Sequence, residues 1–420
     1  MIILAIKFNG LSVLAYLLWL VVCGWLVCLV LTLYARYRQR PLEALNDNSL
    51  KKNDAPLVSI LVAARNEEHR VLDQSMRSML AQDYGQFEVI AVNDRSTDST
   101  GSILNSIAQT DNRLQSIEGR ELPSGWLGKP YAMHQALNHA HGEWILATDA
   151  DMIFDKATLR TAVAHSCARE ADALTLIPYF EAGSFWERVM IPTWTWVLWM
   201  FTISYRINNP KTQGALGIGG FFLMRRAVLE RVGGYEALKD EVLDDVRLAE
   251  MIKRSGGKLL SEYAPGLVRT RMYRNFGEMW ESCSKSWFAG MKFSLLFATL
   301  CVCWMYSIAV LPPFVGLISA IGILIGVDER LWQFCIPAIL SWLLQVAVLM
   351  LVSFRSDTSP VYALTAPLGL GVLYAMLLDS GIRITIGKGV KWKGRMVYER
   401  SGVCPPHLGT FASRRSKTEE

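Results

Sequence analysis

The sequence predicts an α/β domain with a mostly parallel, Rossmann-like sheet, joined to several transmembrane α-helices. Between residues 56 and 292, short apolar runs alternate with segments whose apolar residues recur at helical spacing. This alternation is typical of a parallel sheet covered by helices on both faces. The chain is strongly apolar on either side of this region, and its 420 residues are 51% hydrophobic yet 19% charged. That mixture indicates a soluble part combined with membrane spans.

Residues 1–40 are predicted to form an N-terminal transmembrane anchor. Leu11–Leu33 is a run of 23 apolar or small residues, against the roughly 20 that cross a bilayer. A signal peptide is the alternative, but the apolar core is too long for one and no small-residue cleavage site follows. The basic residues that come next are Arg36, Arg38, Arg40, Lys51 and Lys52. These basic residues predict that the chain after the anchor lies in the cytoplasm. Residues 41–55 are interpreted as a linker.

Three short apolar runs, Leu57–Ala64, Phe87–Val92 and Trp144–Thr148, are predicted to be buried strands. Helices between them are indicated by apolar residues at helical spacing, namely Leu72, Met76, Met79 and Leu80, then Ile103, Leu104 and Ile107, then Ala132, Ala136 and Ala140. Ligands of such sheets bind at the carboxyl ends of the strands. The polar residues that follow each strand are therefore the candidate site.

Two polar segments follow the first two strands. The first is Ala64-Arg65-Asn66-Glu67-Glu68 and the second is Asn93-Asp94-Arg95-Ser96-Thr97-Asp98. Carboxylates in this position can accept hydrogen bonds from a base or a ribose, and Asp94 is predicted to do so. Asp98 is predicted instead to cap the following helix.

Asp149 and Asp151 follow the third strand. Two carboxylates this close at the end of a buried strand are costly unless they meet a cation. Hard divalent ions such as Mg²⁺ or Mn²⁺ prefer oxygen ligands and bridge to diphosphates. The pair therefore predicts a divalent metal that neutralises a leaving diphosphate.

Further along, Asp244 and Asp245 provide a candidate general base. They also suit an acidic helix start, and both interpretations can hold together. Lys129 is a candidate cation for phosphate. The glycine cluster Gly217–Phe222 permits close backbone approach to a ligand, although a plain turn is the alternative.

The apolar segments after the strands complete the predicted architecture. Phe185–Tyr205 is rich in Trp but interrupted by charges and Pro192, so it is interpreted as an interfacial segment, with a core helix as the alternative. Residues 293–382 are predicted to hold the C-terminal transmembrane helices, and residues 383–420 a basic cytoplasmic tail. A tail and a domain on the same side require an even number of spans between them. Division at Pro312 and Pro313 therefore predicts four spans after the domain and five in all.

Composition excludes other classes of site. The net charge of +5 is small for the chain length and gives no reason to expect a nucleic-acid partner. The eight cysteines form no Cys-x-x-Cys pair and no Cys/His cluster. Neither a zinc site nor a disulfide framework is predicted.

These motifs, in this order and spacing, resemble those of the family 2 glycosyltransferases with the GT-A fold over Pro56–Trp287. The segments Trp126-Leu127-Gly128-Lys129 and Trp392-Lys393-Gly394-Arg395 look more particularly like the lipid-modifying members, those associated with hopanoid and carotenoid glycosylation. The flanking spans fit the membrane-bound branch of the family, and a bacterial inner membrane suits it.

The resemblance implies a role for each candidate residue. The nucleotide and substrate site would comprise Ala64, Arg65, Glu67, Asp94, Lys129, Asp149, Gly219, Gly220, Phe221 and Trp287. Within it, Glu67 and Asp94 would hold the base and ribose, Asp151 the metal, and Asp149 the donor together with the metal. Asp245 would deprotonate the acceptor in an inverting, single-displacement reaction.

Some positions depart from the family pattern. Asn93 stands where many members have Asp, and Asp244 replaces the usual Glu, which leaves Asp244 as a second candidate for the base. The Gln-x-x-Arg-Trp motif of processive polysaccharide synthases is absent. In the matching Ser284-Lys285-Ser286-Trp287, only Trp287 fits, with Lys285 as a substitute cation.

The sequence therefore predicts transfer of one sugar from a nucleotide-sugar, with UDP-sugars favoured, to a lipid hydroxyl. Hopanoid, carotenoid, sphingolipid and glycerolipid acceptors all fit. The alternatives are a short-chain exopolysaccharide synthase and a non-catalytic membrane protein with a degenerate domain.

Overall fold

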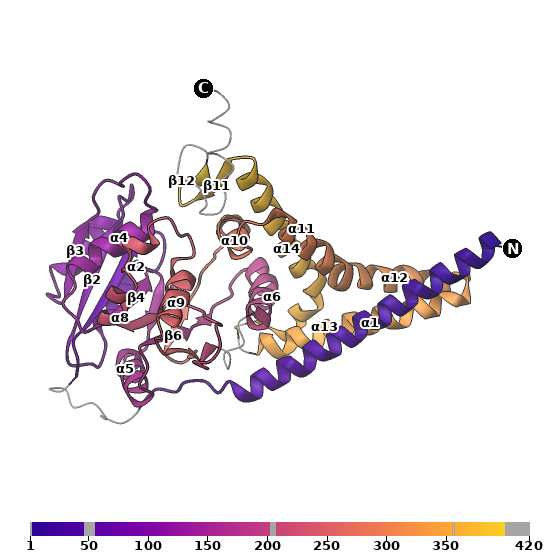
Figure 1. Cartoon of the computed structure of the whole chain (residues 1–420), viewed down its shortest axis with the longest axis horizontal. Coiled ribbons are helices and arrows are strands. Elements are labelled where there is room, and N and C mark those ends of the chain that lie inside the picture. The colour runs from indigo at the N-terminus through magenta and orange to yellow at the C-terminus, as the bar shows by residue number, and fades with distance from the viewer. Residues whose placement is uncertain (1, 46–54, 202–206, 355, 357, 400–420) are drawn as a thin grey trace, which may run out of the picture. The chain divides into compact units, whose positions relative to one another are not determined.

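The computed structural model describes residues 2–45, 55–201, 207–354, 356 and 358–399. The chain divides into two compact units, seen in Figure 1. The sheet unit comprises Gln39–Glu181, Phe201–Met272 and Arg383–Glu420, and the helical unit comprises Met1–Arg38, Ala182–Met200 and Tyr273–Ile382. Two predicted segments, residues 46–54 with Lys51 and Lys52 and residues 400–420 of the tail, lie outside the described residues.

The sheet unit is built on a seven-stranded sheet of order β3-β2-β1-β4-β8-β6-β9. Its strands are β1 (Val58–Ala64), β2 (Phe87–Asn93), β3 (Leu114–Glu118), β4 (Trp144–Asp149), β6 (Ala173–Ile177), β8 (Phe222–Arg225) and β9 (Leu259–Tyr263). All neighbours pair in parallel except at β8, which is antiparallel to both β4 and β6. The predicted mostly parallel α/β sheet is confirmed.

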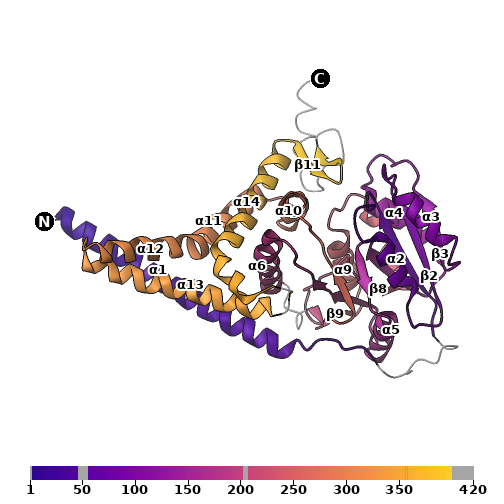
Figure 2. The same cartoon turned by 180° about the vertical axis from the view of Figure 1, so that it is seen from behind.

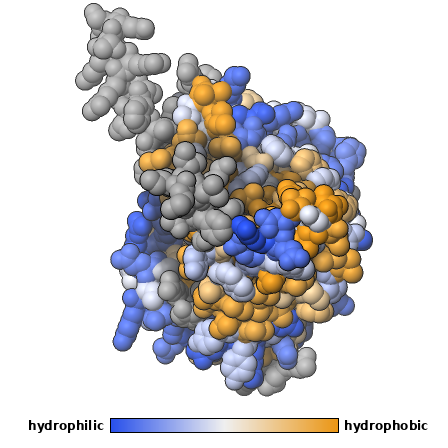
Figure 3. All heavy atoms as spheres, turned by 90° about the vertical axis from the view of Figure 1, so that its right-hand side faces the viewer, coloured by the Kyte–Doolittle hydropathy of each residue, from blue (hydrophilic) through white to orange (hydrophobic). Residues whose placement is uncertain are grey.

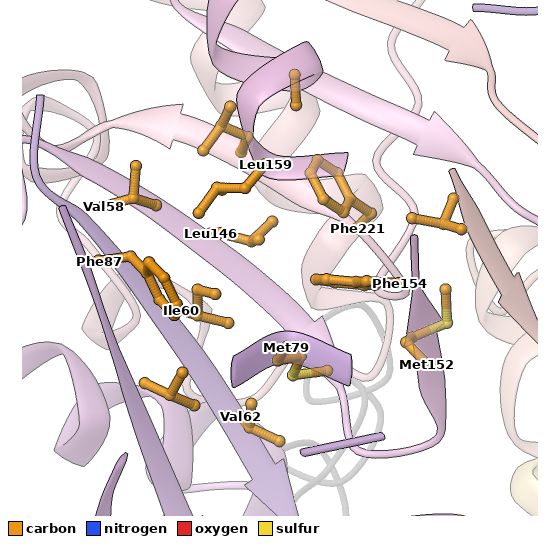
Figure 4. Close-up of a cluster of buried hydrophobic side chains, with 14 of the residues drawn as sticks. Val58, Ile60, Val62, Met79, Phe87, Leu146, Met152, Phe154, Leu159 and Phe221 are labelled. Atoms are coloured by element: carbon orange, nitrogen blue, oxygen red, sulfur yellow. The ribbon is translucent and has the colours of Figure 1, made fainter. Parts of the chain in front are cut away.

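Helices cover both faces of this sheet because alternate residues of a strand point to opposite sides. Ile60 of β1 belongs to a core shared with α2 (Leu72–Leu80), α3 (Thr100–Ala108) and α5 (Thr158–Ala168). Its neighbour Leu61 belongs to the opposite core, shared with α4 (Gly128–Asn138), α8 (Arg226–Arg231) and α9 (Asp244–Arg254). Figure 4 shows the first core, where side chains of β1 face Met79 of α2 and Phe221 approaches Phe154.

Smaller elements complete the sheet unit. A three-stranded sheet joins β5 (Met152–Phe154), β10 (Val268–Thr270) and β7 (Tyr179–Phe180), and a short 3-10 helix, η1, covers Glu236–Leu238. The C-terminal segment forms an antiparallel hairpin of β11 (Lys388–Trp392) and β12 (Arg395–Glu399). The described part of the predicted basic tail is therefore structured.

The helical unit is formed by helices and short helical turns. They are α1 (Ile2–Arg38), α6 (Phe185–Phe201), α10 (Phe276–Gly290), α11 (Leu295–Met305), the π-helical turn η2 (Tyr306–Val310), α12 (Leu311–Leu324), η3 (Glu329–Leu331), α13 (Trp332–Ser353), η4 (Pro360–Thr365) and α14 (Ala366–Thr385). Figures 1 and 2 both show α1, α12 and α13 side by side. Figure 3 shows hydrophobic side chains over much of the face that it views.

The predicted five spans are wrong for the described residues, which contain four helices long and apolar enough to cross a membrane: Val13–Arg38, Leu295–Leu324, Glu329–Ser353 and Pro360–Thr385. Pro312 and Pro313 do not divide the second. They lie in the first turn of α12, directly after the wider turn η2. Proline is tolerated in a first helical turn, and a π-helical turn relieves the lost backbone hydrogen bonds.

The Trp-rich segment is a helix packed inside the helical unit. Most of the described side chains of α6 are buried, and Glu187 is fully buried. Trp196 stacks on Trp25 of α1 with ring centroids 5.2 Å apart. A Cβ on Gly369 of α14 would lie 2.4 Å from the Thr193 hydroxyl oxygen. This packing favours the core-helix alternative, and residues 202–205 of the predicted segment lie outside the described part.

Candidate active site

The predicted site residues lie at one edge of the sheet because their strands are parallel and in register. Ala64 pairs with Asn93 of β2, and Ala63 pairs with Asp149 of β4. The segments after β1, β2 and β4 therefore begin at the same level. The Asp94 amide donates to the Ala64 carbonyl oxygen at 2.7 Å, which holds the first two segments together.

Lys129 and Gly219 connect Asp149 with Asp244 and Asp245. Lys129 Nζ lies 2.8 Å from Asp149 Oδ1 and 3.9 Å from Asp244 Oδ1. The Gly219 amide donates to Asp245 Oδ2 at 2.6 Å. A Cβ on Gly219 would lie 2.9 Å from Lys129 Nζ and 3.2–3.3 Å from oxygens of Asp149 and Asp245. Only glycine lets the backbone pass this close to all three side chains.

Charge explains why Lys129 stays ionised here. Burial by itself lowers the pKa of the Lys129 amine. The carboxylates of Asp149, Asp244 and Asp245 outweigh burial and hold that pKa well above its usual value. The lysine is therefore a permanent cation in the middle of an acidic site.

Asp245 has the properties expected of a general base. Burial raises the pKa of the Asp245 carboxyl to about 6, the charge of Asp244 adds to that rise, and Lys129 opposes it. A base whose pKa lies near neutral pH combines the ionised form with proton affinity. Asp244 and Asp245 also start α9, so the acidic helix start expected as an alternative is present as well.

The glycine cluster places two aromatic residues on opposite sides of the sheet. Phe221 is fully buried against Phe154, with ring centroids 5.4 Å apart. Its side chain therefore belongs to the core, and Phe222 faces the site in its place. A small pocket is lined by Lys129, Met133, Ala147, Thr148, Gly219, Phe222, Tyr235, Asp244, Asp245 and Leu248.

Asp151 forms a second acidic group with Glu67. Burial raises the pKa of the Asp151 carboxyl to about 6, followed by the charges of Asp149 and Glu67. Arg70 Nη1 lies 3.0 Å from Asp151 Oδ2, and Arg70 Nε lies 3.6 Å from Glu67 Oε2. Glu67 is 3% exposed, whereas the Asp151 side chain is 17% exposed and can still be reached from solvent.

The carboxylates suit a divalent cation chemically. Among the residues the structure describes, no group of three or more His, Cys, Asp or Glu side chains is arranged to hold a metal by itself. Asp149 and Asp151 nevertheless offer oxygen donors, and the raised pKa of Asp151 reflects burial first and then repulsion from Asp149 and Glu67, both of which a bound cation would offset. The remaining ligands would then come from a diphosphate or water, as is usual for Mg²⁺.

At the other end of the site, Asp94 is surrounded by arginines. Arg95 and Arg395 both bond to the Asp94 carboxylate, Arg395 Nη1 at 3.2 Å. Arg65 Nη1 donates to the backbone oxygens of Asp94 at 2.7 Å and Arg95 at 2.9 Å. Lys393 forms an ion pair with Glu67. Asp98 accepts from the Thr100 amide at 3.0 Å at the start of α3, but the N-cap residue of that helix is Ser99, one position after the predicted cap.

Sequence reasoning missed the partners of these carboxylates. Arg70 was not among the predicted site residues, and Lys393 and Arg395 were predicted only as part of the basic cytoplasmic tail and of the segment that resembles lipid-modifying members. The only local signal for the hairpin was Gly394 between two strand-like runs, and it was weak because Lys393 is not a residue that such a turn favours. Trp287 belongs to α10 in the helical unit, so its predicted contribution to the site stays a prediction.

Part of the sheet unit is similar to known glycosyltransferases. Residues 59–233 match the family model described as glycosyl transferase family 2. A beta-monoglucosyldiacylglycerol synthase of Synechocystis is 30% identical over 200 residues, covering 46% of this chain and 39% of the relative. A 4,4'-diaponeurosporenoate glycosyltransferase of Staphylococcus aureus is 30% identical over 133 residues, covering 31% and 34%.

A solved mannosyltransferase from Pyrobaculum calidifontis, in complex with GDP-Man and Mn2+, aligns with 87% of this chain and 98% of its own, at a TM-score of 0.49 and 18% identity. The chain spans 39% and 34% of the length of the two curated relatives above. It spans 20% of a further beta-monoglucosyldiacylglycerol synthase, from Nostoc.

Proposed function

We propose that this chain, whose residues 59–233 match the glycosyl transferase family 2 model, moves one sugar from a nucleotide-sugar to the hydroxyl group of a membrane lipid. The observation that carries the proposal is the convergence at Gly219. Lys129, Asp149 and Asp245 come from three separate segments and meet around this residue. Such a meeting brings a phosphate-binding cation, a donor-binding carboxylate and a base to one point.

The donor would lie along the edge formed by the ends of β1, β2 and β4. Glu67 and Asp94 would accept hydrogen bonds from the nucleoside, and Lys129 is positioned to meet phosphate oxygens. Asp151, together with Asp149, would hold a divalent cation. When bound, such a cation supplies charge neutralisation for the departing diphosphate. Arg70 fixes the Asp151 carboxylate at 3.0 Å.

The acceptor hydroxyl would lose its proton to Asp245. The acceptor oxygen then attacks the anomeric carbon of the donor sugar from the face opposite the diphosphate. The bond between that carbon and the diphosphate oxygen breaks, and the nucleoside diphosphate leaves. One displacement of this kind inverts the anomeric configuration. The Gly219 amide orients the Asp245 carboxylate beside the small pocket. Asp244, 6% exposed, sustains the proton affinity of Asp245 through its charge.

A lipid acceptor is supported by the apolar helices and by the relatives. The described residues contain helices able to span a membrane on both sides of the sheet-forming sequence. Two relatives carry names that refer to lipid-like acceptors, a diacylglycerol and a carotenoid acid. An acceptor dissolved in the bilayer accounts for a transferase domain tethered on both sides.

The C-terminal hairpin also constrains how the chain crosses the membrane. Lys393 and Arg395 follow the last apolar helix and bond to Glu67 and Asp94, which precede the first of the C-terminal helices. Both segments must therefore face the same side of the membrane. The chain then crosses the membrane an even number of times after residue 292. Because three candidate helices lie in that part, at least one of them does not cross. Arg36 and Arg38 at the end of α1 favour the cytoplasm for this side, and we assign the protein to a bacterial inner membrane.

The test is turnover of UDP- and GDP-sugars by the full-length protein in detergent with a bacterial lipid extract. We expect release of one nucleotide together with a new glycolipid, dependent on Mn²⁺ or Mg²⁺ and abolished by chelator. Sugar transferred equally well to soluble acceptors would contradict the lipid assignment. Absence of release with every donor, from protein shown to be folded, would contradict the proposed activity itself.

A further inference from the structure

The C-terminal hairpin is held on the carboxylates assigned to the nucleoside. Lys393 pairs with Glu67 across 326 residues of sequence, and Arg395 pairs with Asp94 across 301. Tyr398 of the same hairpin is 3% exposed, and its hydroxyl is hydrogen-bonded to the backbone of Val242, just before Asp244. The hairpin is thus anchored to the site both at its turn and along β12.

The hairpin turn holds Lys393 in an unusual backbone conformation. Lys393 and Gly394 form the two-residue loop, with φ angles of +43° and +79°. Such turns require positive φ at both positions, which glycine and asparagine adopt easily and lysine does not. A lysine held in this costly conformation at the tip indicates a function for its side chain.

The two motifs that resemble lipid-modifying enzymes meet at this point. A Cβ on Gly128, in the Trp-Leu-Gly-Lys segment, would lie 2.7 Å from Asp94 Oδ2 and 2.8 Å from Arg395 Nη1. Because Gly128 has no side chain, the Asp94–Arg395 ion pair can occupy the space beside it. The Trp-Lys-Gly-Arg segment supplies the arginine, so the two motifs form one structural feature around Asp94.

Positive charge is crowded here beyond what Asp94 balances. Burial lowers the pKa values of the Arg65 and Arg395 guanidinium groups, and neighbouring guanidinium groups lower them further, while Asp94 opposes the shift. Arg65 Nε is buried without a hydrogen-bond partner in the described structure. Guanidinium groups forced together in this way gain from an additional anion, and a phosphate accepts several such hydrogen bonds.

We propose that the β11–β12 hairpin is part of the donor site, with Lys393 and Arg395 contacting the diphosphate of the nucleoside diphosphate. The inference rests on the proposed function and adds to it two binding residues from the far end of the chain. With Arg65 they form a cationic cover on the phosphates. In the absence of donor, the carboxylates of Glu67 and Asp94 hold these two cations in place.

The test compares affinities of the full-length protein in detergent for UDP and for uridine, and for GDP and guanosine, by titration calorimetry. Lys393→Gln and Arg395→Gln should each weaken binding of the diphosphate by about tenfold or more, the typical loss for a charged hydrogen bond. Their affinity for the nucleoside should stay within about twofold. Lys391→Gln is the matched control, because Lys391 is an exposed lysine of the same hairpin.

Each other outcome has a definite meaning. Unchanged diphosphate affinity in both folded variants would overturn the inference, and so would equal loss for nucleoside and diphosphate, which would show that the hairpin only positions Glu67 and Asp94. Competition between UDP and a short-chain phosphatidic acid that disappears in Arg395→Gln would overturn it in favour of a lipid phosphate. Wild-type protein that binds neither nucleotide would refute the proposed function, which is a separate result.

Discussion

Replacement of Asp245 by asparagine removes the predicted base with little change in shape. The side-chain oxygen of the introduced asparagine can still accept the hydrogen bond that the Gly219 amide gives to Asp245 at 2.6 Å. Donor binding should persist, because the carboxylates assigned to the nucleotide are untouched. Turnover should fall about 10²–10⁴-fold, the usual loss on removal of a general base.

The same substitution should raise stability at high pH. The Asp245 carboxyl has a pKa of about 6 in the folded protein against a usual 3.8, so folding favours its protonated form. Stability from this group is fully present below pH 3.8 and is lost as the pH rises through about 6. About two pK units correspond to at most about 3 kcal/mol. Because the Asp245 residue is partly exposed, we expect about 1–2 kcal/mol of extra stability for the Asp245→Asn variant near pH 8.

Two measurements check this reasoning. Turnover of the wild type should decline as the pH falls through about 6, because Asp245 becomes protonated. Thermal unfolding should show the Asp245→Asn variant more stable than the wild type near pH 8 and equal to it near pH 4. Retention of more than about a tenth of the activity would refute Asp245 as the base. Asp244→Asn is the matched control. If Asp244→Asn, and not Asp245→Asn, abolished the decline of turnover at low pH, the general base would be Asp244.

Four further substitutions probe the rest of the site. Lys129→Gln removes a cation that lowers the Asp245 pKa, so the acid limb of the turnover profile should move to higher pH, and an unmoved limb would contradict the coupling. Asp151→Asn should raise the Mn²⁺ concentration needed for half-maximal turnover by about tenfold or more while the melting temperature holds, and an unchanged metal requirement would remove Asp151 from the metal site. Gly217→Ala places a Cβ 2.1 Å from the Asp245 carbonyl oxygen, so unfolding by denaturant should show a loss of about 2 kcal/mol or more. Gly220→Ala meets only a flexible methionine side chain, at 2.8 Å, and is expected to cost less; equal losses would contradict the steric argument.

Much of the sheet edge that carries the candidate site was predictable from local sequence. Hydrophobic runs located β1, β2 and β4 to within a residue or two, since a buried strand needs apolar side chains on both faces. The polar segments after them had to share an edge once the strands were parallel. The chemical roles expected for Asp94 and Asp149 came from this rule, and the register of Ala63 with Asp149 agrees with it.

The membrane part was less predictable. Length and composition identified apolar segments, but composition could not tell whether Pro312 and Pro313 ended a helix. A proline within a first turn leaves the helix intact, and only the backbone path through η2 decided that Leu295–Leu324 is continuous. In the same way, the burial of α6 depended on partners in α1 and α14 that its own sequence does not contain.

By itself, the sequence determined an α/β domain whose residues 59–233 match the glycosyl transferase family 2 model, acidic residues after its strands, and apolar helices around it. Those features are local, because strand and helix periodicity and short motifs are carried by neighbouring residues. The tertiary structure decided which charges meet. The pairing of Lys393 with Glu67 and Arg395 with Asp94 leaves no periodic trace in the sequence, since an ion pair requires only that two side chains be brought within about 4 Å by the fold.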